Sequence, residues 1–391
     1  MILLLVIIFS LICYQLAKKR ILFLTSRYRI KPKSLPSYYG MNIAMWNFFG
    51  SILAIIFLYI LGRLGFEVNQ TYTYLAIISI FLIFLVFIFA SLKGRFRAQM
   101  YFELTLKWLL NIAALISILI TISILLSVLF EAIEFFKIIP IEKFILGTKW
   151  LPESYDFGVI PVIAGTLLIT IIAMLVAVPL GLFSAIYLNE YADKKSRTFI
   201  KPILEILSGV PTIVYGYFAA LSVGPLIRTI GEAISLSIST ESALAAGLVM
   251  GIMITPYILS LSDDAINSIP QTLRDAALAL GSTKAEMSLK IIIPAASSGI
   301  ISAMLLAVSR AIGETMIVVM AAGISASLTL NPFDSVSTFT VQIVTLLVGD
   351  QEFDNPKTLA AFALALTLFV ITLFLNLWAL IAMRKKGKYY E

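Results

Sequence analysis

Nine long apolar runs, separated by shorter polar segments, dominate the hydrophobic pattern of this chain. They cover approximately residues 1–17, 43–62, 72–92, 106–130, 160–183, 208–230, 241–262, 297–322 and 358–383. Most are close to the roughly 20 residues that an α-helix needs to cross the hydrocarbon core of a bilayer. The pattern therefore predicts an all-α polytopic membrane protein.

The first apolar run, residues 1–17, could be mistaken for a secretory signal peptide. A signal peptide has basic residues before its apolar segment and a small-x-small cleavage site after it. Here the basic residues Lys18, Lys19 and Arg20 follow the apolar segment, and no clear cleavage site is present. We therefore expect a retained helix whose N-terminus lies outside the cytoplasm.

If the N-terminus lies outside and each apolar run crosses the membrane, successive loops alternate between the two sides, and the basic residues are divided unequally between them. Of the 29 Lys and Arg residues, 22 fall in one set of loops and 6 in the other, and Arg310 lies within an apolar run. Cytoplasmic loops of membrane proteins carry the excess of basic residues. This rule predicts a multi-pass membrane protein with residues 263–296 and the C-terminus in the cytoplasm. It also explains the net charge of +7 better than binding to nucleic acid does.

The composition excludes several classes of function. Hydrophobic residues make up 60% of the 391 positions, and no polar segment is long enough to form a soluble domain. The chain has no histidine and a single cysteine, Cys13, which excludes Ser-His-Asp triads, a disulfide framework and the usual zinc sites. It also lacks a G-x4-G-K-[ST] loop, so it cannot hydrolyse ATP itself. We expect no catalytic residues, no metal and no other cofactor.

The composition changes near residue 105. Residues 1–105 contain three apolar runs that are rich in Ile, Leu and Phe and carry no embedded charge, whereas Gly and Pro become frequent within the runs after residue 160. Gly and Pro let helices approach closely and kink, which suits a translocation pathway but also occurs in ordinary helix packing. We expect an N-terminal extension over residues 1–105, with an accessory, regulatory or assembly role, and a six-helix domain over residues 106–391.

The polar segment 263–296 contains a short amphipathic helix. Its apolar positions recur at i, i+3, i+4 and i+7, so they share one face on which a partner could pack. These positions are Leu273, Ala276, Ala277 and Leu280. Gly281 favours the left-handed conformation that ends helices, and Pro294 stands where the next helix is expected to begin.

The same segment has a characteristic spacing. It reads Asp275-Ala276-Ala277, three residues, Gly281, nine residues, Ile291, one residue and Ile293-Pro294. This arrangement resembles the Glu-Ala-Ala loop of ABC-importer permeases, with Asp275 in place of Glu and Ile293 in place of Leu. The resemblance implies that the helix couples the chain to an ATPase. The alternative is an ordinary amphipathic surface helix.

Two charged residues, Arg310 and Glu314, lie inside the run 297–322. An ionised side chain within a membrane costs about 3 kcal/mol or more, so it is expected to face protein or water. If the helix continues, the two residues share a face and could form a self-satisfied structural pair. In the functional interpretation, the guanidinium of Arg310 donates hydrogen bonds to a tetrahedral oxyanion. Glu314 orients the guanidinium and lowers its affinity for the anion.

The segment Arg310-Ala311-Ile312-Gly313-Glu314-Thr315 resembles the signature of phosphate ABC-importer permeases, and the resemblance extends through most of residues 105–383. The residues that follow, from Met316 to Gly323, and the segment Asn331-Pro332-Phe333-Asp334 are similar to the PstC type. The resemblance implies a type I ABC-importer fold of the MetI-like class in the bacterial inner membrane. It leaves the role of residues 1–105 open.

The family resemblance also implies partners and a mechanism. A PstC-type permease forms a heterodimer with a PstA-type sister permease in the membrane lipid, receives phosphate from a periplasmic phosphate-binding protein and is powered by a PstB-type ATPase dimer. Phosphate would pass Arg310, Glu314 and Thr315 by alternating access. The coupling residues would be Asp275, Ala276, Ala277, Gly281, Ile291 and Pro294. Three alternatives remain open: a permease for sulfate or molybdate, an ATP-independent secondary transporter or channel, and a sensory membrane protein.

Overall fold

The structure is a computed structural model that describes residues 2–28, 31–64, 70–90, 92, 97–236, 238–348 and 355–387. The chain forms two compact units, Met1–Ser123 and Ile124–Glu391. The boundary between them falls inside helix α4 (Ala98–Ile138), beyond the composition change near residue 105. Each unit is described separately below.

Helices long and apolar enough to cross a membrane account for most of the described residues. There are nine of them within those residues, as the hydrophobic pattern predicted. They are Ile2–Arg27, Pro36–Arg63, Thr71–Ala90, Ala98–Ile138, Ile160–Tyr191, Thr212–Ala233, Ala243–Asn267, Lys284–Ile312 and Pro356–Trp378. The prediction of an all-α polytopic architecture is therefore confirmed.

The first unit is built from α1 (Ile2–Tyr28), α2 (Pro36–Arg63), α3 (Gln70–Ala90) and the first part of α4. Helix α2 begins at Pro36, where the missing N–H of proline costs no helical hydrogen bond. α2 contacts α1 and α3, and α1 also contacts α3. Their shared core includes Cys13, Ile21 and Tyr39.

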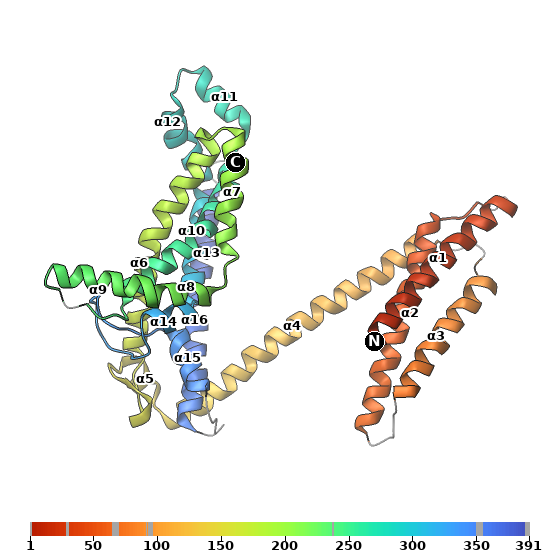
Figure 1. The fold of residues 1–391 in the computed structure, drawn as a ribbon, viewed down its shortest axis with the longest axis horizontal. Coiled ribbons are helices and arrows are strands. Elements are labelled where there is room, and N and C mark those ends of the chain that lie inside the picture. Colours follow the sequence, from red (N-terminus) through yellow and green to blue (C-terminus); the bar gives the residue numbers. More distant parts are fainter. Residues whose placement is uncertain are drawn as a thin grey trace. The chain divides into compact units, whose positions relative to one another are not determined.

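The second unit is a bundle around α10 (Ala243–Asn267). In Figure 1 its long helices run side by side, and α10 contacts both α6 (Ile160–Ile186) and α13 (Ile293–Ile312), while α13 contacts α16 (Pro356–Gly387). Small residues allow this close packing. A Cβ atom added at Gly251 would lie 2.7 Å from the side chain of Val176 on α6.

The predicted span 208–230 begins later than expected, at Thr212. Helix α7 (Lys194–Ser208) ends before Pro211, and α8 (Thr212–Phe218), a π-helical turn η3 (Ala219–Val223) and α9 (Gly224–Ala233) follow. Proline cannot donate a hydrogen bond and disfavours the helical conformation of the preceding residue, which explains the break after α7. In Figure 1, α9 extends to one side of the bundle.

A small folded segment lies at one end of the second unit, around α5 (Ile141–Leu146). Strands β1 (Trp150–Leu151) and β2 (Asp156–Phe157) pair antiparallel and flank the 3-10 turn η1 (Pro152–Ser154). The side chain of Trp150 is buried, with 4% of its surface exposed. Its Nε1 donates to Oε1 of Gln342 on α15 (Phe339–Leu347) at 2.8 Å, so a buried polar partner holds the indole inside.

Candidate functional site

The predicted coupling helix is present as α11 (Gln271–Ala279), which lies with α12 (Lys284–Met287) at the end of the bundle opposite α5 (Figure 1). It begins directly after Pro270 and ends at a turn in which Gly281 has φ of +86°. This is the left-handed conformation expected for the glycine that ends a helix. The predicted stop at Gly281 is therefore confirmed.

The polar segment is shorter than the predicted 263–296. Helix α10 continues to Asn267, and α12 begins at Lys284 with a capping box between Thr283 and Glu286. A π-helical turn, η4 (Ser288–Ile292), joins α12 to α13 without a break. Pro294 is in the first turn of α13, as predicted, and both Pro294 and Ile291 are half-buried.

The inward face of α11 differs from the predicted one. The two buried residues of the helix are Arg274 and Ala277. Ala277 was predicted to share an outward apolar face with Leu273, Ala276 and Leu280, and this is wrong because it packs in a cluster with Ile266 and other residues beneath the helix. Positions 274 and 277 are three apart, so both point to the same side.

Arg274 ties α11 to two other elements. Its Nη1 donates to the carbonyl oxygen of Ile269 at 2.6 Å and its Nη2 to that of Ile266 at 2.9 Å, near the C-terminus of α10. Its Nε donates to Oε1 of Glu190 at 3.1 Å and its Nη2 to Oδ1 of Asn189 at 3.3 Å, both in the π-helical turn η2 (Tyr187–Tyr191) after α6. The side chains of Arg274 and Glu190 are only 10% and 5% exposed. One guanidinium therefore holds the position of the helix relative to α6 and α10.

A second buried charge, Asp263 of α10, lies next to this network. The carboxylate is completely buried and accepts hydrogen bonds from Nη2 of Arg197 at 2.9 Å and from Nζ of Lys201 at 2.7 Å, both on α7. Nδ2 of Asn189 also donates to it, at 3.1 Å. The hydrogen bond to Asp263 holds the pKa of the Lys201 ammonium above its usual value. Asp263 thus fixes α7 against α10 and, through Asn189, is connected to Arg274.

The roles of Arg274, Glu190 and Asp263 were not identified from the sequence. Asp263 and Glu190 each follow an apolar run, where a carboxylate is usually taken for the solvated end of a helix. The signal that could have identified Asp263 is the pair Arg197 and Lys201, which are four residues apart and share one face of an otherwise amphipathic helix. A cavity of about 400 Å³ is lined by members of both networks, including Arg197, Glu190 and Arg274.

The outward side of α11 is open. Leu273, Asp275 and Ala276 are exposed, and Leu280 is exposed beyond the end of the helix. The structure therefore presents an acidic residue beside apolar and small side chains at the tip of the bundle. Such a mixed surface suits a partner that binds the tip as a unit.

The second predicted site contains Arg310, Glu314 and Thr315. The apolar run 297–322 is not one helix, because α13 ends at Ile312, Gly313 follows as its C-cap, and α14 (Met316–Ala321) is separate. The expectation that Arg310 and Glu314 share a helix face is therefore wrong. Among the described residues neither side chain belongs to an ion pair. Glycine has a low helix propensity, which favours the end of α13 at Gly313 although the hydropathy continues.

Arg310 is exposed in the last turn of α13. Its guanidinium carbon lies 5.4 Å from the ring centroid of Tyr257 on α10, a cation–π contact that restrains the side chain without using its hydrogen-bond donors. Glu314 and Thr315 are half-buried in the connection between α13 and α14. The backbone carbonyl of Glu314 accepts a hydrogen bond from Oγ1 of Thr340 at 2.7 Å. The arrangement leaves a planar fork of donors facing out of this chain.

The segment 331–334 forms a loop that side-chain hydrogen bonds hold in place. Oδ2 of Asp334 accepts from Oγ1 of Thr329 at 2.7 Å and its Oδ1 accepts from Nδ2 of Asn331 at 2.9 Å. The carbonyls of Pro332 and Asp334 accept from the first backbone N–H groups of α10. The loop thus caps α10, which supplies Tyr257 to the Arg310 contact.

Two family models match the chain. Residues 177–387 match the model described as the binding-protein-dependent transport system inner membrane component. This range contains α11, Asp263, Arg274 and Arg310. Residues 3–68 match a model described as a phosphate ATP-binding cassette transporter, so the similarity extends into the first unit.

The chain is also similar to curated permeases. It is 34% identical over 252 residues to the probable ABC transporter permease protein YqgH of Bacillus subtilis. The matched region covers 64% of this chain and 80% of the relative. It is 32% identical over 268 residues to the phosphate transport system permease protein PstC of Xylella fastidiosa strain Temecula1, covering 63% and 81%. With PstC 1 of Mycobacterium bovis it shares 31% identity over 309 residues, covering 70% and 90%.

The fold resembles that of a solved importer. A bacterial ABC transporter involved in the import of the acidic polysaccharide alginate contains a chain that superimposes with a TM-score of 0.50 at 17% sequence identity. The match covers 73% of this chain and 99% of that chain. At this identity the likeness establishes the transmembrane fold alone.

Proposed function

The chain belongs to the family of binding-protein-dependent transport system inner membrane components, and on that premise we propose that it is a permease subunit of an ATP-driven importer of inorganic phosphate. Two relatives, matched over 81% and 90% of their own length, are named phosphate transport system permease proteins. The match of residues 3–68 to a phosphate transporter model supports the same substrate from a separate part of the chain.

The observation that carries the proposal is the exposed guanidinium of Arg310. A charged side chain on a membrane helix costs about 3 kcal/mol or more unless it faces protein or water. Among the described residues no carboxylate pairs with it, and Tyr257 holds it from one side. A restrained guanidinium with open donors matches the geometry of a tetrahedral oxyanion. We place Arg310 on the translocation pathway, with Glu314 and Thr315 beside it at the helix break.

The coupling function is assigned to α11. Its outward residues Asp275 and Ala276 would contact a separate cytoplasmic ATPase, while Ala277 and Arg274 hold the helix to α6 and α10. Gly281, Ile291 and Pro294 set the turn and the return into α13. ATP-driven movement of the partner would then move α11 together with the helices to which it is bound, because buried hydrogen bonds join them.

The remaining assignments follow from this role. This chain would pair with a PstA-type permease, use a PstB-type ATPase dimer and receive phosphate from a periplasmic binding protein, and would hydrolyse no ATP itself. We propose that residues 263–296 and the C-terminus lie in the cytoplasm, in agreement with the 22 to 6 division of basic residues. Residues 1–105 form the N-terminal extension and residues 106–391 the permease domain.

Phosphate uptake into proteoliposomes tests the pathway assignment. Arg310→Gln should abolish uptake while the complex still assembles, and Arg310→Lys should retain only a small fraction because it keeps the charge and loses the fork. Arg228→Gln is the matched control, since Arg228 is an exposed arginine that pairs with Glu232 on α9. Uptake by Arg310→Gln at the wild-type rate would contradict the assignment. Uptake of sulfate or molybdate in preference to phosphate would favour the other oxyanion permeases.

A further inference from the structure

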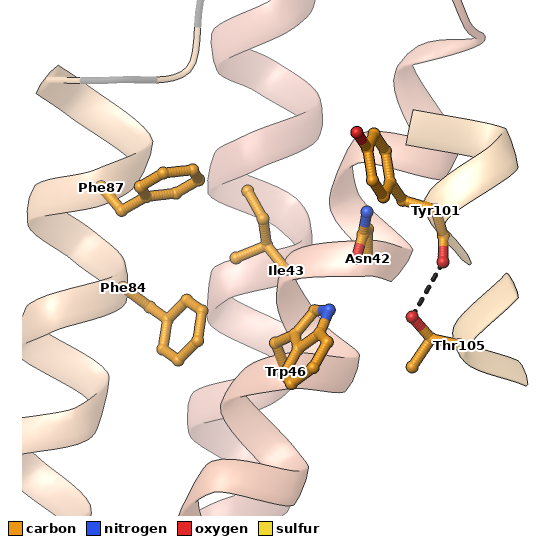
Figure 2. Close-up of a pocket in the computed structure, with 7 residues that line it drawn as sticks. All are labelled: Asn42, Ile43, Trp46, Phe84, Phe87, Tyr101 and Thr105. Atoms are coloured by element: carbon orange, nitrogen blue, oxygen red, sulfur yellow. Dashed lines mark hydrogen bonds between the residues drawn. The ribbon is translucent and has the colours of Figure 1, made fainter. Parts of the chain in front are cut away.

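The first unit contains an open groove to which the proposed function assigns no role. It has a volume of about 440 Å³ and is lined by residues of three helices (Figure 2). These are Asn42, Ile43 and Trp46 of α2, Phe84 and Phe87 of α3, and Tyr101 and Thr105 of α4. In Figure 2, Ile43 and Trp46 lie between the two phenylalanines and the side chains of α4. The size falls within the range of small-molecule sites, and all lining residues belong to one compact unit.

The side chains that line the groove are mostly aromatic or aliphatic, and Asn42 adds a polar amide. Trp46 is 52% exposed, so an indole ring forms part of the open wall. Asn42 is buried, and its side-chain amide forms no hydrogen bond with the described residues. A groove of this kind in a membrane-spanning unit fits a ligand with a long apolar part and a polar group near one end.

The charge around the groove is strongly positive. Residues 1–123 contain twelve Lys and Arg residues and only two acidic residues, Glu67 and Glu103, which is a net charge of +10. All of these basic residues except Arg63 fall in the sequence segments expected on the cytoplasmic side. No described residue of this unit belongs to an ion pair. The positive charge is therefore available to an anionic partner.

Two of these basic residues lie beside the groove. The backbone N–H of Gln99 donates to Oγ of Ser34 at 3.2 Å, which brings the segment containing Lys33 to the start of α4 next to Arg97. Tyr101 of the groove is one turn from Arg97 and donates its backbone N–H to the carbonyl of that residue. Lys33 and Arg97 are both exposed. The backbone positions of Lys33 and Arg97 therefore lie close to Tyr101 in the groove wall.

We propose that this groove binds an acyl chain of an anionic phospholipid whose phosphate group lies between Lys33 and Arg97. The apolar wall accommodates the chain, Asn42 and Trp46 contact the ester region, and the basic residues pair with the headgroup. Basic residues near the cytoplasmic surface attract anionic lipids, and basic pockets between helices select their headgroups. The bound lipid would anchor the first unit in the cytoplasmic leaflet. The proposal does not depend on the identity of the transported substrate.

Photocrosslinking of the full-length chain in its complex tests the proposal. The complex is placed in nanodiscs of phosphatidylcholine that contain a trace of phosphatidylglycerol or phosphatidylcholine with a diazirine on the acyl chain, and crosslinked peptides are identified by mass spectrometry. We expect phosphatidylglycerol to label the peptides that line the groove in α2, α3 and α4, and phosphatidylcholine to label them far less. The soluble glycerophosphoglycerol headgroup should not compete, because it lacks the acyl chain.

Variants separate this site from general attraction to a basic protein. Lys33→Gln/Arg97→Gln should weaken labelling of the groove about 30-fold, since each surface cation contributes roughly 1 kcal/mol toward an anionic lipid. Lys18→Gln/Arg27→Gln is the control, because it removes the same charge from α1, which does not line the groove. Thr105→Trp should fill the groove and abolish labelling. Equal labelling by the two lipids, an equal loss in the control, or protection of the groove by a partner protein would overturn the proposal.

Discussion

Removal of the Arg274 side chain should loosen α11 from the helices it is expected to move. Arg274→Met keeps the length of the side chain but removes all four hydrogen bonds, to Ile266, Ile269, Asn189 and Glu190. It leaves the Glu190 carboxylate, which is 5% exposed, without its ion-pair partner. Breaking a buried ion pair by removing one partner costs about 3–5 kcal/mol. The change should therefore destabilise the α11 attachment by about that amount.

Hydrogen exchange measured on peptides of α11 reports this loss directly. A change of about 3 kcal/mol corresponds to more than a hundredfold increase in the opening equilibrium, so amide exchange in residues 271–279 should accelerate by about two orders of magnitude. ATP hydrolysis by the assembled complex should continue while the phosphate transported per ATP falls. The reason is that the ATPase would then move a helix that no longer pulls on α6 and α10.

Two further variants serve as controls for Arg274→Met. Lys290→Met removes an ion pair with Glu286 whose side chains are 74% and 48% exposed, so it should cost only about 0–1 kcal/mol. Arg274→Met combined with Glu190→Gln should recover part of the loss, because no unpaired buried charge remains. Wild-type exchange in the single variant, or an equal effect of Lys290→Met, would refute the assigned role of Arg274.

Three further predictions concern other parts of the chain. Gly281→Val should cost about 1–3 kcal/mol and uncouple transport from ATP hydrolysis, because a β-branched residue resists φ of +86°; a wild-type ratio of phosphate to ATP would contradict this. Lys201, whose pKa the hydrogen bond to Asp263 raises above 10.5, should stabilise the fold fully below that pH and lose this contribution as pH rises through its folded pKa. Melting temperatures between about pH 10 and pH 12 should therefore fall more for the wild type than for Lys201→Met, and parallel curves over that range would exclude the effect. Deletion of residues 1–100 should leave phosphate uptake largely intact, and a complex that no longer assembles would show that the extension is needed for the fold.

The membrane-spanning helices could be predicted because a bilayer imposes a length and an apolar composition on each of them. The turn at Gly281 was predictable for a similar reason, since a local backbone conformation requires that residue type. The inward face of α11 was not, because Leu273 and Leu280 mark an apolar stripe while Arg274 is buried by carbonyls and a carboxylate from other elements. Periodicity describes which residues share a face, but tertiary hydrogen bonds decide which face is buried.

The end of α13 also could not be predicted from the local sequence pattern. Hydropathy runs on from Ile312 into Met316 and beyond, so a single helix was expected, and the pairing of Arg310 with Glu314 depended on it. The structure ends the helix at Gly313 and connects the next residues to Thr340 through the carbonyl of Glu314. A contact 26 residues further along the chain holds the connection after the break, and no local pattern contains that contact. The sequence did single out Arg310 as a cation within an apolar run, and its role on the translocation pathway stays a prediction.

ATP hydrolysis tests the central claim most directly. The chain would be purified with its sister permease and ATPase, reconstituted into proteoliposomes, and measured with phosphate-loaded binding protein, with the unloaded protein and with a sulfate-binding counterpart. The account predicts stimulation by the phosphate-loaded protein alone, and loss of that stimulation in Gly281→Val. A complex that assembles and hydrolyses ATP at the same rate under all three conditions would contradict the assignment of this chain to phosphate import.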